Sequence, residues 1–341
     1  MTVTNPTNIS TVDTVGRADL SRTTPVFGLR MLGLGSSVPD TRVTNADLAE
    51  RLDTDDQWIR DRTGIHARRV AAIGESTLTL AAEAGQRAIA DAGLTAADID
   101  LVVVATATPV SPCPSTASRV VATLGLACGG FDLNGACTGF VHALHTAAAL
   151  LVDPSLATIL VIGADRFTTL VDPDDRSTAV LFGDGAGAVV VGATAAEAGG
   201  SGILGTDVGG DHTGVGVLEV PPGDPWVAMD GPELFRRATR GLVASANRAL
   251  DRAGATGSDV DLYVPHQANA RIIAATADRL GLDPATVVYD LAERANTSAA
   301  SIPLALDAAH QAGRLQPGMR VLISGIGAGL GWSSLYLRWG A

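Results

Sequence analysis

The amino-acid sequence predicts an α/β fold made of two similarly folded halves. Short apolar runs typical of buried strands, such as residues 101–105, alternate with alanine-rich segments of helical composition. Strands of this kind belong to sheets that helices cover on both faces. The segment 87–101 also recurs at 248–262, a displacement of 161 residues without a gap. This repeat indicates two equivalent halves, at about 28–198 and 199–341.

Each copy of the repeat is predicted to contain a helix, a glycine that ends it, an aspartate-containing loop and a buried strand. The strand predicted at 158–162 corresponds to 319–323 at the same displacement, and 188–192 predicts a further strand. That displacement also relates Cys137 to Ser298. A pseudo-twofold axis would bring these two loops together near the boundary between the halves, where a shared active site is favoured.

The composition excludes several classes of chemistry. The 341 residues carry a formal net charge of −12, so we expect no nucleic-acid partner. All 24 basic residues are arginine, which excludes Schiff-base, pyridoxal-phosphate and P-loop mechanisms, since each needs a lysine amine. No apolar run approaches the roughly 18 residues of a membrane helix, so we expect no membrane partner.

The three cysteines, Cys113, Cys128 and Cys137, form no CxxC pair and no metal-ligand spacing, so no metal site is predicted. A sparse, odd set of cysteines suggests a reducing compartment, which we take to be the cytoplasm. Residues 1–26 are rich in Thr, Asn and Ser and lack the apolar region of a secretory signal. We expect 1–27 to be a disordered or extended tail.

Cys137 is the candidate nucleophile. It lies in Asn134-Gly-Ala-Cys-Thr-Gly-Phe140, directly before a segment of helical composition. The positive end of a helix dipole lowers the pKa of a thiol and increases its thiolate fraction. The alternative is a buried structural cysteine, which is a common role of free cysteines and the role we assign to Cys128.

His266 and Asn296 are the candidate polar partners. His266 ends a predicted buried strand and precedes a polar run, a position where α/β proteins place chemistry, although a structural histidine remains an alternative. Asn296 precedes another predicted helix, so it could be a simple N-cap. His142 and His145 follow Cys137 on its helix, and we expect packing or surface roles for both.

Two glycine-rich stretches, 182–188 and 325–331, do not fit the nucleotide-binding pattern because each precedes a strand-like run. We interpret both as tight turns that let the backbone approach the active site. The backbone N–H near Ala328 is a candidate donor to an oxyanion.

Over residues 28–341 the chain resembles β-ketoacyl-ACP synthase III of the thiolase superfamily. The resemblance is carried by the Cys137 loop, by the glycine-rich C-terminal turn and by six further strings: Asp55-Asp-Gln-Trp58-Ile, Arg62-Thr-Gly-Ile65, Asp175-Arg176, Phe182-Gly-Asp-Gly-Ala-Gly, Val264-Pro-His-Gln-Ala-Asn269 and Asn296-Thr-Ser-Ala-Ala-Ser301. It implies a thiolase fold, in which two pseudo-symmetric halves form a five-layered αβαβα sandwich. It also implies a homodimer.

The resemblance implies a condensing acyltransferase that starts fatty acid or polyketide chains. Cys137 would take the acyl group from an acyl-CoA. His266 and Asn296 would bind malonyl-ACP and stabilise the enolate formed as CO₂ leaves. The backbone N–H groups of Cys137 and Ala328 would form the oxyanion hole. Acyl-CoA and malonyl-ACP are substrates, and no cofactor is implied.

The remaining site residues also rest on the resemblance. The implied CoA contacts are Thr54, Trp58, Arg62, Arg176 and Asn269. Cys113 falls where a dimer partner often inserts a large aromatic into the acyl pocket, so a roomier pocket for branched or longer primers is expected. The implied carrier-protein contacts are Arg236, Arg271 and Arg279.

Two other functions remain open. One is a relative that moves the acyl group from Cys137 to an alcohol or amine without condensation, although the retained His266 and Asn296 favour condensation. The other is a non-catalytic partner subunit, against which the intact Cys137 argues.

Overall fold

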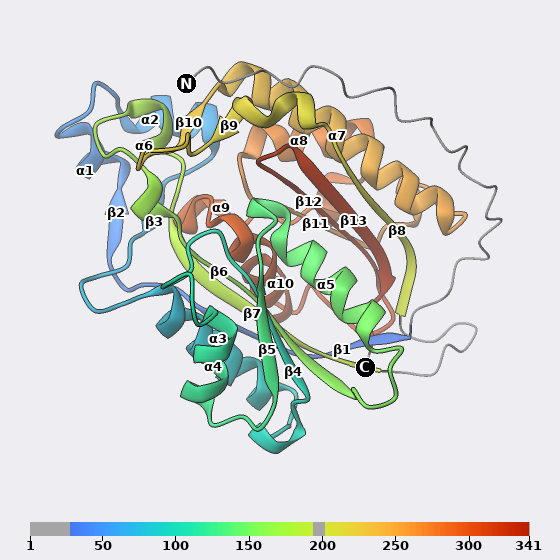
Figure 1. Ribbon diagram of the computed structural model, residues 1–341. Helices are drawn as coiled ribbons and strands as arrows, with labels where there is room; N and C mark the ends of the chain where they lie inside the picture. The colour runs from blue at the N-terminus through green and yellow to red at the C-terminus, as the bar shows by residue number, and fades with distance from the viewer. Residues whose placement is uncertain (1–27, 194–201, 341) are drawn as a thin grey trace, which may run out of the picture.

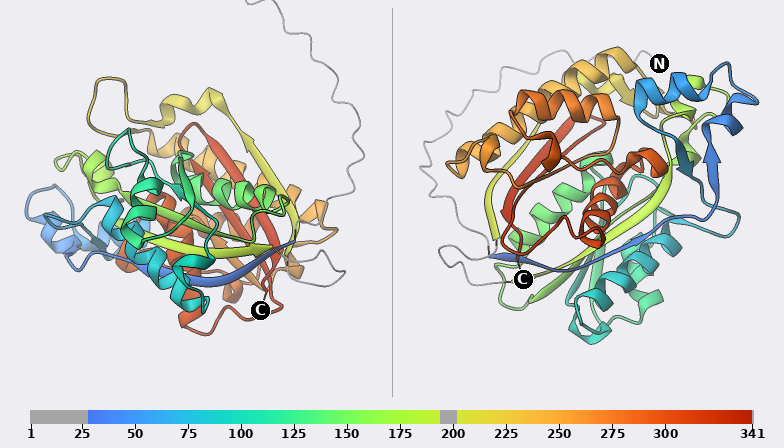
Figure 2. Two further views of the ribbon diagram at one scale, coloured as in Figure 1. Left: turned by 60° about the horizontal axis from the view of Figure 1, so that its bottom comes forward. Right: turned by 180° about the vertical axis from the view of Figure 1, so that it is seen from behind.

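The structure is a computed structural model that describes residues 28–193 and 202–340. The predicted tail, 1–27, and the predicted boundary between the halves, at 198/199, lie outside the described residues. Two large sheets form the framework, and two helices lie between them (Figures 1 and 2). No helix within the described ranges is long and apolar enough to cross a lipid bilayer.

The first sheet has five strands, all from residues 29–193. Its spatial order is β1 (Leu29–Ser37), β7 (Asp184–Ala193), β6 (Thr158–Arg166), β4 (Leu101–Ala105) and β5 (Gly129–Leu133). Strand β4 pairs in parallel with β5 and β6, whereas β7 pairs antiparallel with β1 and β6. The strand predicted at 101–105 is therefore confirmed as β4, and 188–192 lies inside β7.

The second sheet has four strands, all from residues 202–338. Its order is β11 (Leu262–Pro265), β12 (Arg320–Gly327), β13 (Gly331–Arg338) and β8 (Gly202–Gly210). Two short antiparallel pairs lie apart from it: β2 (Arg42–Thr44) with β3 (Ala67–Arg69), and β9 (Leu218–Glu219) with β10 (Ala228–Met229).

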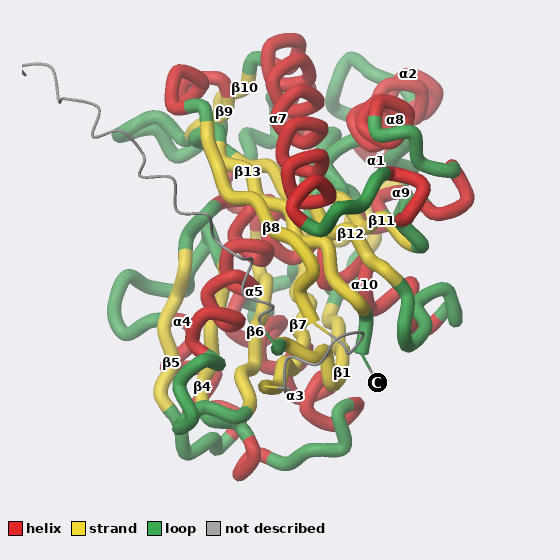
Figure 3. Tube along the Cα trace, turned by 90° about the vertical axis from the view of Figure 1, so that its right-hand side faces the viewer, coloured by secondary structure: helices red, strands yellow, loops and turns green. Residues whose placement is uncertain are grey.

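Helices complete five layers. Outer helices α3 (Thr77–Asp91) and α4 (Thr116–Leu124) pack on the first sheet, and α7 (Gly231–Arg252) packs on the second with α8 (Ala270–Arg279) beside it. Helices α5 (Gly139–Leu150) and α10 (Ser301–Gln311) lie between the sheets and contact both (Figure 3). The shorter helices are α1 (Asn45–Ala49), α2 (Asp56–Thr63), α6 (Arg176–Ala179) and α9 (Leu291–Arg294). The expected αβαβα sandwich is confirmed.

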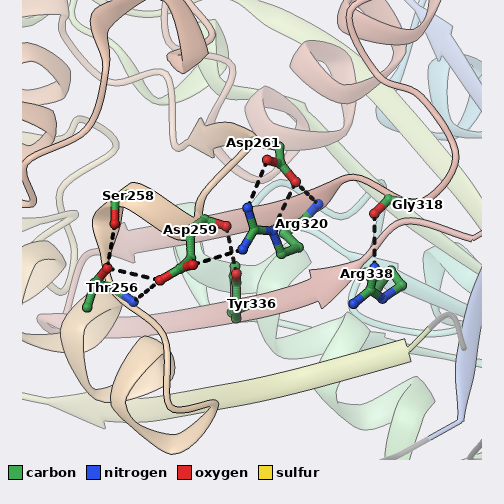
Figure 4. Close-up of polar contacts among 8 residues, drawn as sticks. All are labelled: Thr256, Ser258, Asp259, Asp261, Gly318, Arg320, Tyr336 and Arg338. Carbon is green, nitrogen blue, oxygen red and sulfur yellow. Dashed lines mark hydrogen bonds and ion pairs between the residues drawn. The ribbon is translucent and has the colours of Figure 1, made fainter. Parts of the chain in front are cut away.

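The register of the two halves differs from the sequence prediction by one residue. Leu101 of β4 pairs with Ile159 of β6, and Leu262 of β11 pairs with Val321 of β12. The first strands are thus 161 residues apart, but the second strands are 162 apart. Figure 4 shows the capping interactions of the second half, where Asp261 accepts from the Arg320 backbone N–H at 2.7 Å.

The second half therefore contains one residue more than the first half. This residue lies between β11 and Asn296, because the one-turn helices that precede the two central helices are also 162 residues apart. These are η2 (Ala136–Thr138) and η7 (Ser298–Ala300). Cys137 therefore corresponds in structure to Ala299, and the predicted equivalence with Ser298 is wrong. An ungapped sequence match cannot show an insertion that occurs beyond its end.

The two glycine-rich stretches have different structures. The stretch 325–331 holds the turn between β12 and β13, as predicted, but only 328–330 form it, because 325–327 belong to β12 and Gly331 begins β13. The stretch 182–188 is not a turn, because β7 begins at Asp184 and runs through it. Its glycines let α10 approach the sheet: a Cβ on Gly187 would lie 2.7 Å from the backbone nitrogen of Leu304.

Candidate active site

The three predicted catalytic residues line one cavity of about 580 Å³. Cys137 comes from η2, His266 from the end of β11, and Asn296 from the loop before η7. The rest of the wall is mainly apolar and comes from α2, α7, α8, the loop after α6 and the strands β9, β10 and β12; it includes Trp58, Leu181, Phe182, Leu218, Met229, Leu234, Phe235, Ile272 and Ile326. The expectation that two loops of the duplicated halves meet at a shared site is confirmed.

Cys137 is held by a tight turn after β5. The Asn134 side-chain oxygen accepts a hydrogen bond from the Ala136 N–H at 3.0 Å, which closes the turn. Ala136 adopts a left-handed conformation, with φ of 46°. The Cys137 side chain is 3 % exposed, and its Sγ donates to the Ser298 hydroxyl at 3.5 Å.

The Cys137 thiol is neutral in this structure, contrary to the expectation of a lowered pKa. Burial raises its pKa to about 12, and the carboxylate of Asp165 adds to this effect. The hydrogen bond with Ser298 opposes it. The sequence showed the helix start but could not show how completely the surrounding layers exclude water from the thiol.

His266 is also neutral, and one of its ring nitrogens has a fixed partner. Burial lowers its pKa to about 3. Its Nδ1 lies 2.6 Å from the Ser301 hydroxyl, which accepts from the Gln267 N–H at 3.4 Å. This arrangement favours donation of the Ser301 proton to Nδ1, so that the imidazole hydrogen is carried by Nε2.

Asn296 presents its amide donor to the cavity because its oxygen is already used. The side-chain oxygen accepts from the Ser298 N–H at 2.9 Å. The backbone is fixed on both sides, since the Asn296 N–H donates to Leu181 and its carbonyl accepts from Gly183. The side-chain NH₂ therefore remains the available group, and the residue is more than the simple N-cap that we considered.

The backbone N–H of Cys137 faces Gly327. A Cβ on Gly327 would lie 2.8 Å from the Cys137 nitrogen and 2.9 Å from the Thr138 nitrogen. Only a residue without a side chain leaves room for another atom beside this N–H. Ala328 follows directly and is half-buried, but it is not part of the cavity wall.

The predicted CoA contacts gather around Trp58. The guanidinium carbons of Arg62 and Arg176 lie 4.5 and 4.9 Å from the centroid of its ring. Trp58, Arg62 and Asn269 line the cavity, whereas Arg176 and Thr54 lie outside its wall. A base sandwiched against Trp58 needs about 3.5 Å on each face, so Arg176 would have to move outward to admit it.

The remaining predicted contacts are more dispersed. Arg271 lines the cavity and lies over Phe235, with 5.6 Å from the guanidinium carbon to the ring centroid. Arg236 is exposed and paired with Glu233, and Arg279 is exposed in the last turn of α8. Cys113 is exposed and lies outside the cavity of this chain.

For three residues of the site, no role was predicted from the sequence, although Ser298 was named as the position related to Cys137. Ser298 and Ser301 lie inside the Asn-Thr-Ser-Ala-Ala-Ser string, and the role of each depends on a contact with Cys137 or His266. Asp165, at the end of the buried strand β6, could have been noticed as a charged residue in an otherwise apolar run. Within the described residues, no group of three or more His, Cys, Asp or Glu side chains could hold a metal ion.

Comparisons with known proteins agree with this geometry. Residues 131–212 match the family 3-oxoacyl-[acyl-carrier-protein] synthase III, and residues 250–339 match its C-terminal family. The curated β-ketoacyl-[acyl-carrier-protein] synthase III of Neisseria gonorrhoeae is 45 % identical over 91 % of this chain and 99 % of its own. That of Rhodospirillum rubrum is 47 % identical over 90 % and 98 %.

Solved structures give the same answer. The synthase III of Pseudomonas aeruginosa has a TM-score of 0.88 and 43 % identity, covering 92 % of this chain and 99 % of its own. The priming β-ketosynthase of the R1128 polyketide pathway has a TM-score of 0.87 and 38 % identity, covering 94 % and 98 %. The chain belongs to the β-ketoacyl-acyl-carrier-protein synthase III family of thiolase-fold condensing enzymes.

Proposed function

We propose that this enzyme joins an acyl group from acyl-CoA to malonyl-ACP in two half-reactions. In the first, the Cys137 sulfur attacks the acyl-CoA thioester, the bond to the CoA sulfur breaks, and the thiol proton passes to that sulfur as free CoA departs. In the second, malonyl-ACP loses CO₂, and the resulting enolate carbon attacks the acyl group on Cys137. The products are β-ketoacyl-ACP and the free thiol, and the chemistry uses no cofactor.

The observation that carries this proposal is the pair of neutral donors beside the thiol. His266 Nε2–H and the Asn296 amide can both donate to the malonyl thioester oxygen as negative charge develops there. Burial keeps the imidazole neutral, so the donor needs no titration at ordinary pH. The N–H groups of Cys137 and Ala328 are proposed to stabilise the tetrahedral oxyanion on the acyl carbon.

We propose that the CoA nucleotide binds at Trp58, against Arg62 and Arg176. The indole ring provides a stacking surface, and the guanidinium groups provide planar, positively charged donors for phosphate and base. Asn269 caps α8 and donates to the Arg62 carbonyl at 3.0 Å, so it positions this wall, and its place in the cavity lining supports its proposed contact with CoA. Thr54 supplies a buried hydroxyl without a partner in the structure.

Carrier-protein docking is proposed at the arginines near the cavity and on the outer helices. Arg271 lines the cavity, while Arg236 and Arg279 are exposed on α7 and α8. Carrier proteins present acidic surfaces, to which exposed guanidinium groups are complementary.

We also propose a homodimer, supported by the edge of the first sheet. Strand β5 is the last strand of that sheet, and its Phe131 side chain is 38 % exposed. An unpaired edge that carries an exposed aromatic favours pairing with a second copy. In this arrangement Cys113 would enter the acyl pocket of the partner, where its small size would accept branched or longer primers. A cytoplasmic location is proposed from the three free cysteines.

The test is intact-protein mass spectrometry after incubation with a panel of acyl-CoAs, followed by addition of malonyl-ACP. We expect the wild type, but not Cys137→Ala, to gain one acyl group and then to release CO₂ and β-ketoacyl-ACP. An ester or amide product without CO₂ would favour acyl transfer to an alcohol or amine. No adduct from any acyl-CoA would favour a non-catalytic subunit.

A further inference from the structure

A buried chain of polar groups extends from Cys137 into the protein. The Cys137 thiol donates to the Ser298 hydroxyl at 3.5 Å, and the N–H of the next residue, Ala299, donates to the Asp165 carboxylate at 3.0 Å. Both Ser298 and Asp165 are 0 % exposed. The catalytic roles assigned to Cys137, His266 and Asn296 do not use either residue, and a carboxylate so deeply buried needs a reason.

Both carboxylate oxygens of Asp165 accept hydrogen bonds from the surrounding protein. One carboxylate oxygen accepts from backbone N–H groups at 2.8 and 3.1 Å and from two threonine hydroxyls at 3.0 and 2.9 Å, all within residues 106–108. The other accepts from the Ala299 N–H at 3.0 Å. The carboxylate is therefore held by five hydrogen bonds, and the one from Ala299 ties it to the residue that follows Ser298.

The Ser298 backbone is equally constrained. Its φ is 52°, in the left-handed region that residues with a side chain seldom adopt. Its N–H donates to the Asn296 side-chain oxygen at 2.9 Å. One residue thus contacts the nucleophile through its side chain and the Asn296 amide through its backbone.

We propose that Ser298, anchored by Asp165, is a positioning residue that orients the Cys137 sulfur and controls how readily the thiol loses its proton. The same pair keeps the Asn296 amide in register with the nucleophile. This inference rests on the proposed function, in which Cys137 is the nucleophile.

The two residues act on the thiol in opposite directions. A hydroxyl beside a thiolate stabilises it, so loss of the Ser298 hydroxyl disfavours the thiolate. A buried negative charge disfavours a second one, so loss of the Asp165 charge favours it. The other titratable or charged groups that share the cavity with Cys137 are His266, Arg62 and Arg271, which neither substitution changes.

The test is the rate at which iodoacetamide alkylates Cys137 in the full-length enzyme, followed by peptide mass spectrometry from pH 6.5 to 9. We expect Ser298→Ala to slow alkylation about three- to tenfold at every pH, which corresponds to a rise in pKa of about 0.5 to 1 unit. Ser298→Gly should behave alike, because glycine accepts the left-handed backbone and loses the same hydroxyl. Asp165→Asn, studied if it folds, should accelerate alkylation.

Ser245→Ala is the matched control, because Ser245 is a fully buried serine on α7 whose hydroxyl has no hydrogen-bond partner among the described residues. It should leave the alkylation rate unchanged, whatever its effect on melting temperature. Wild-type alkylation rates in folded Ser298→Ala and Ser298→Gly would overturn the proposal, as would an acceleration in both. The alkylation assay needs neither acyl-CoA nor carrier protein, so it is independent of the condensation reaction. If the alkylation rates are as expected but the enzyme catalyses no condensation, the proposed function is overturned and the role of Ser298 is not.

Discussion

Residues 134–138 and 296–300 begin the two central helices along the same backbone course, yet they present different chemistry. Each loop starts with an asparagine whose side-chain oxygen accepts from the N–H two residues later, at 3.0 Å for Asn134 and 2.9 Å for Asn296. In each, that later residue, Ala136 or Ser298, is left-handed. Asn134 is exposed, however, whereas Asn296 is 6 % exposed and lines the cavity.

The difference continues at the ends of the two strands behind these loops. Asp165 is the residue before the last one of β6. The residue 162 positions later is Gly327, the last residue of β12. Asp165 accepts from the Ala299 N–H at 3.0 Å, but Gly327 has no side chain to offer the equivalent Cys137 N–H. The two halves thus share one backbone scaffold. In the second-half loop the Ala299 N–H is occupied by the Asp165 carboxylate, whereas in the first-half loop Gly327 leaves the Cys137 N–H open to an oxyanion.

The largest effect is expected from removing the sulfur of Cys137, which distinguishes the loop 134–138 from the loop 296–300. Cys137→Ala should abolish acyl-enzyme formation, because no other group in the cavity can form the thioester. Intact mass after incubation with acyl-CoA measures this directly. An acyl adduct retained by the variant would show that the nucleophile lies elsewhere.

Substitutions in the second half should separate the two half-reactions. His266→Ala or Asn296→Ala should reduce CO₂ release from malonyl-ACP by roughly 10²- to 10³-fold, since each removes a donor to the developing enolate. Acylation of Cys137 should persist in both variants. If either lost acylation as completely as decarboxylation, our division of roles between the two halves would be wrong.

Gly327→Ala should damage the open loop selectively. Its Cβ would lie 2.8 Å from the Cys137 nitrogen, so the backbone must shift and the oxyanion donor is displaced. We expect acylation to slow by roughly 10- to 100-fold. Gly216→Ala, where the nearest atom is a flexible Glu219 oxygen at 3.6 Å, is the control and should acylate at the wild-type rate. Equal acylation rates in the two variants would remove Gly327 from the oxyanion argument.

Away from both loops, Trp58→Ala should affect binding more than chemistry. Loss of the stacking surface should raise KM for acyl-CoA about tenfold, which corresponds to about 1.4 kcal/mol, and leave kcat nearly unchanged. Steady-state kinetics with CoA and pantetheine thioesters test this, because the pantetheine substrate lacks the nucleotide and should be insensitive. A fall in kcat with the pantetheine thioester would place Trp58 closer to the chemistry.

The smallest effect is expected from pH. The pKa of His266 is lowered to about 3 in the folded enzyme, so the imidazole is neutral above that value and becomes charged only as pH falls through it. Decarboxylation by the acylated enzyme should therefore be flat between pH 5 and 8. In the unfolded chain the pKa of His266 is near 6.5, so folding stability should decrease as pH falls below that value. A decarboxylation rate that halves near pH 6.5 would contradict a buried, neutral imidazole.

Most of the architecture was predictable because it depends on local patterns. Apolar runs in the sequence predicted β4 and part of β7. The recurrence of the segment 87–101 at 248–262 indicated the duplication. The stretch 182–188 was mistaken for a turn because glycine suggests a turn in isolation. In the fold these glycines are in a strand, where they make room for a helix backbone.

The sequence by itself determined the class of fold and the duplication and indicated Cys137, His266 and Asn296 as candidates, because helix starts, strand ends and short motifs are properties of neighbouring residues. Only the tertiary structure decided the one-residue shift between the halves, the raised pKa of the thiol and the contacts that join Cys137 to Ser298 and Ala299 to Asp165. Each of these depends on which distant segments exclude water from one another, and burial of that kind arises only when the layers are assembled.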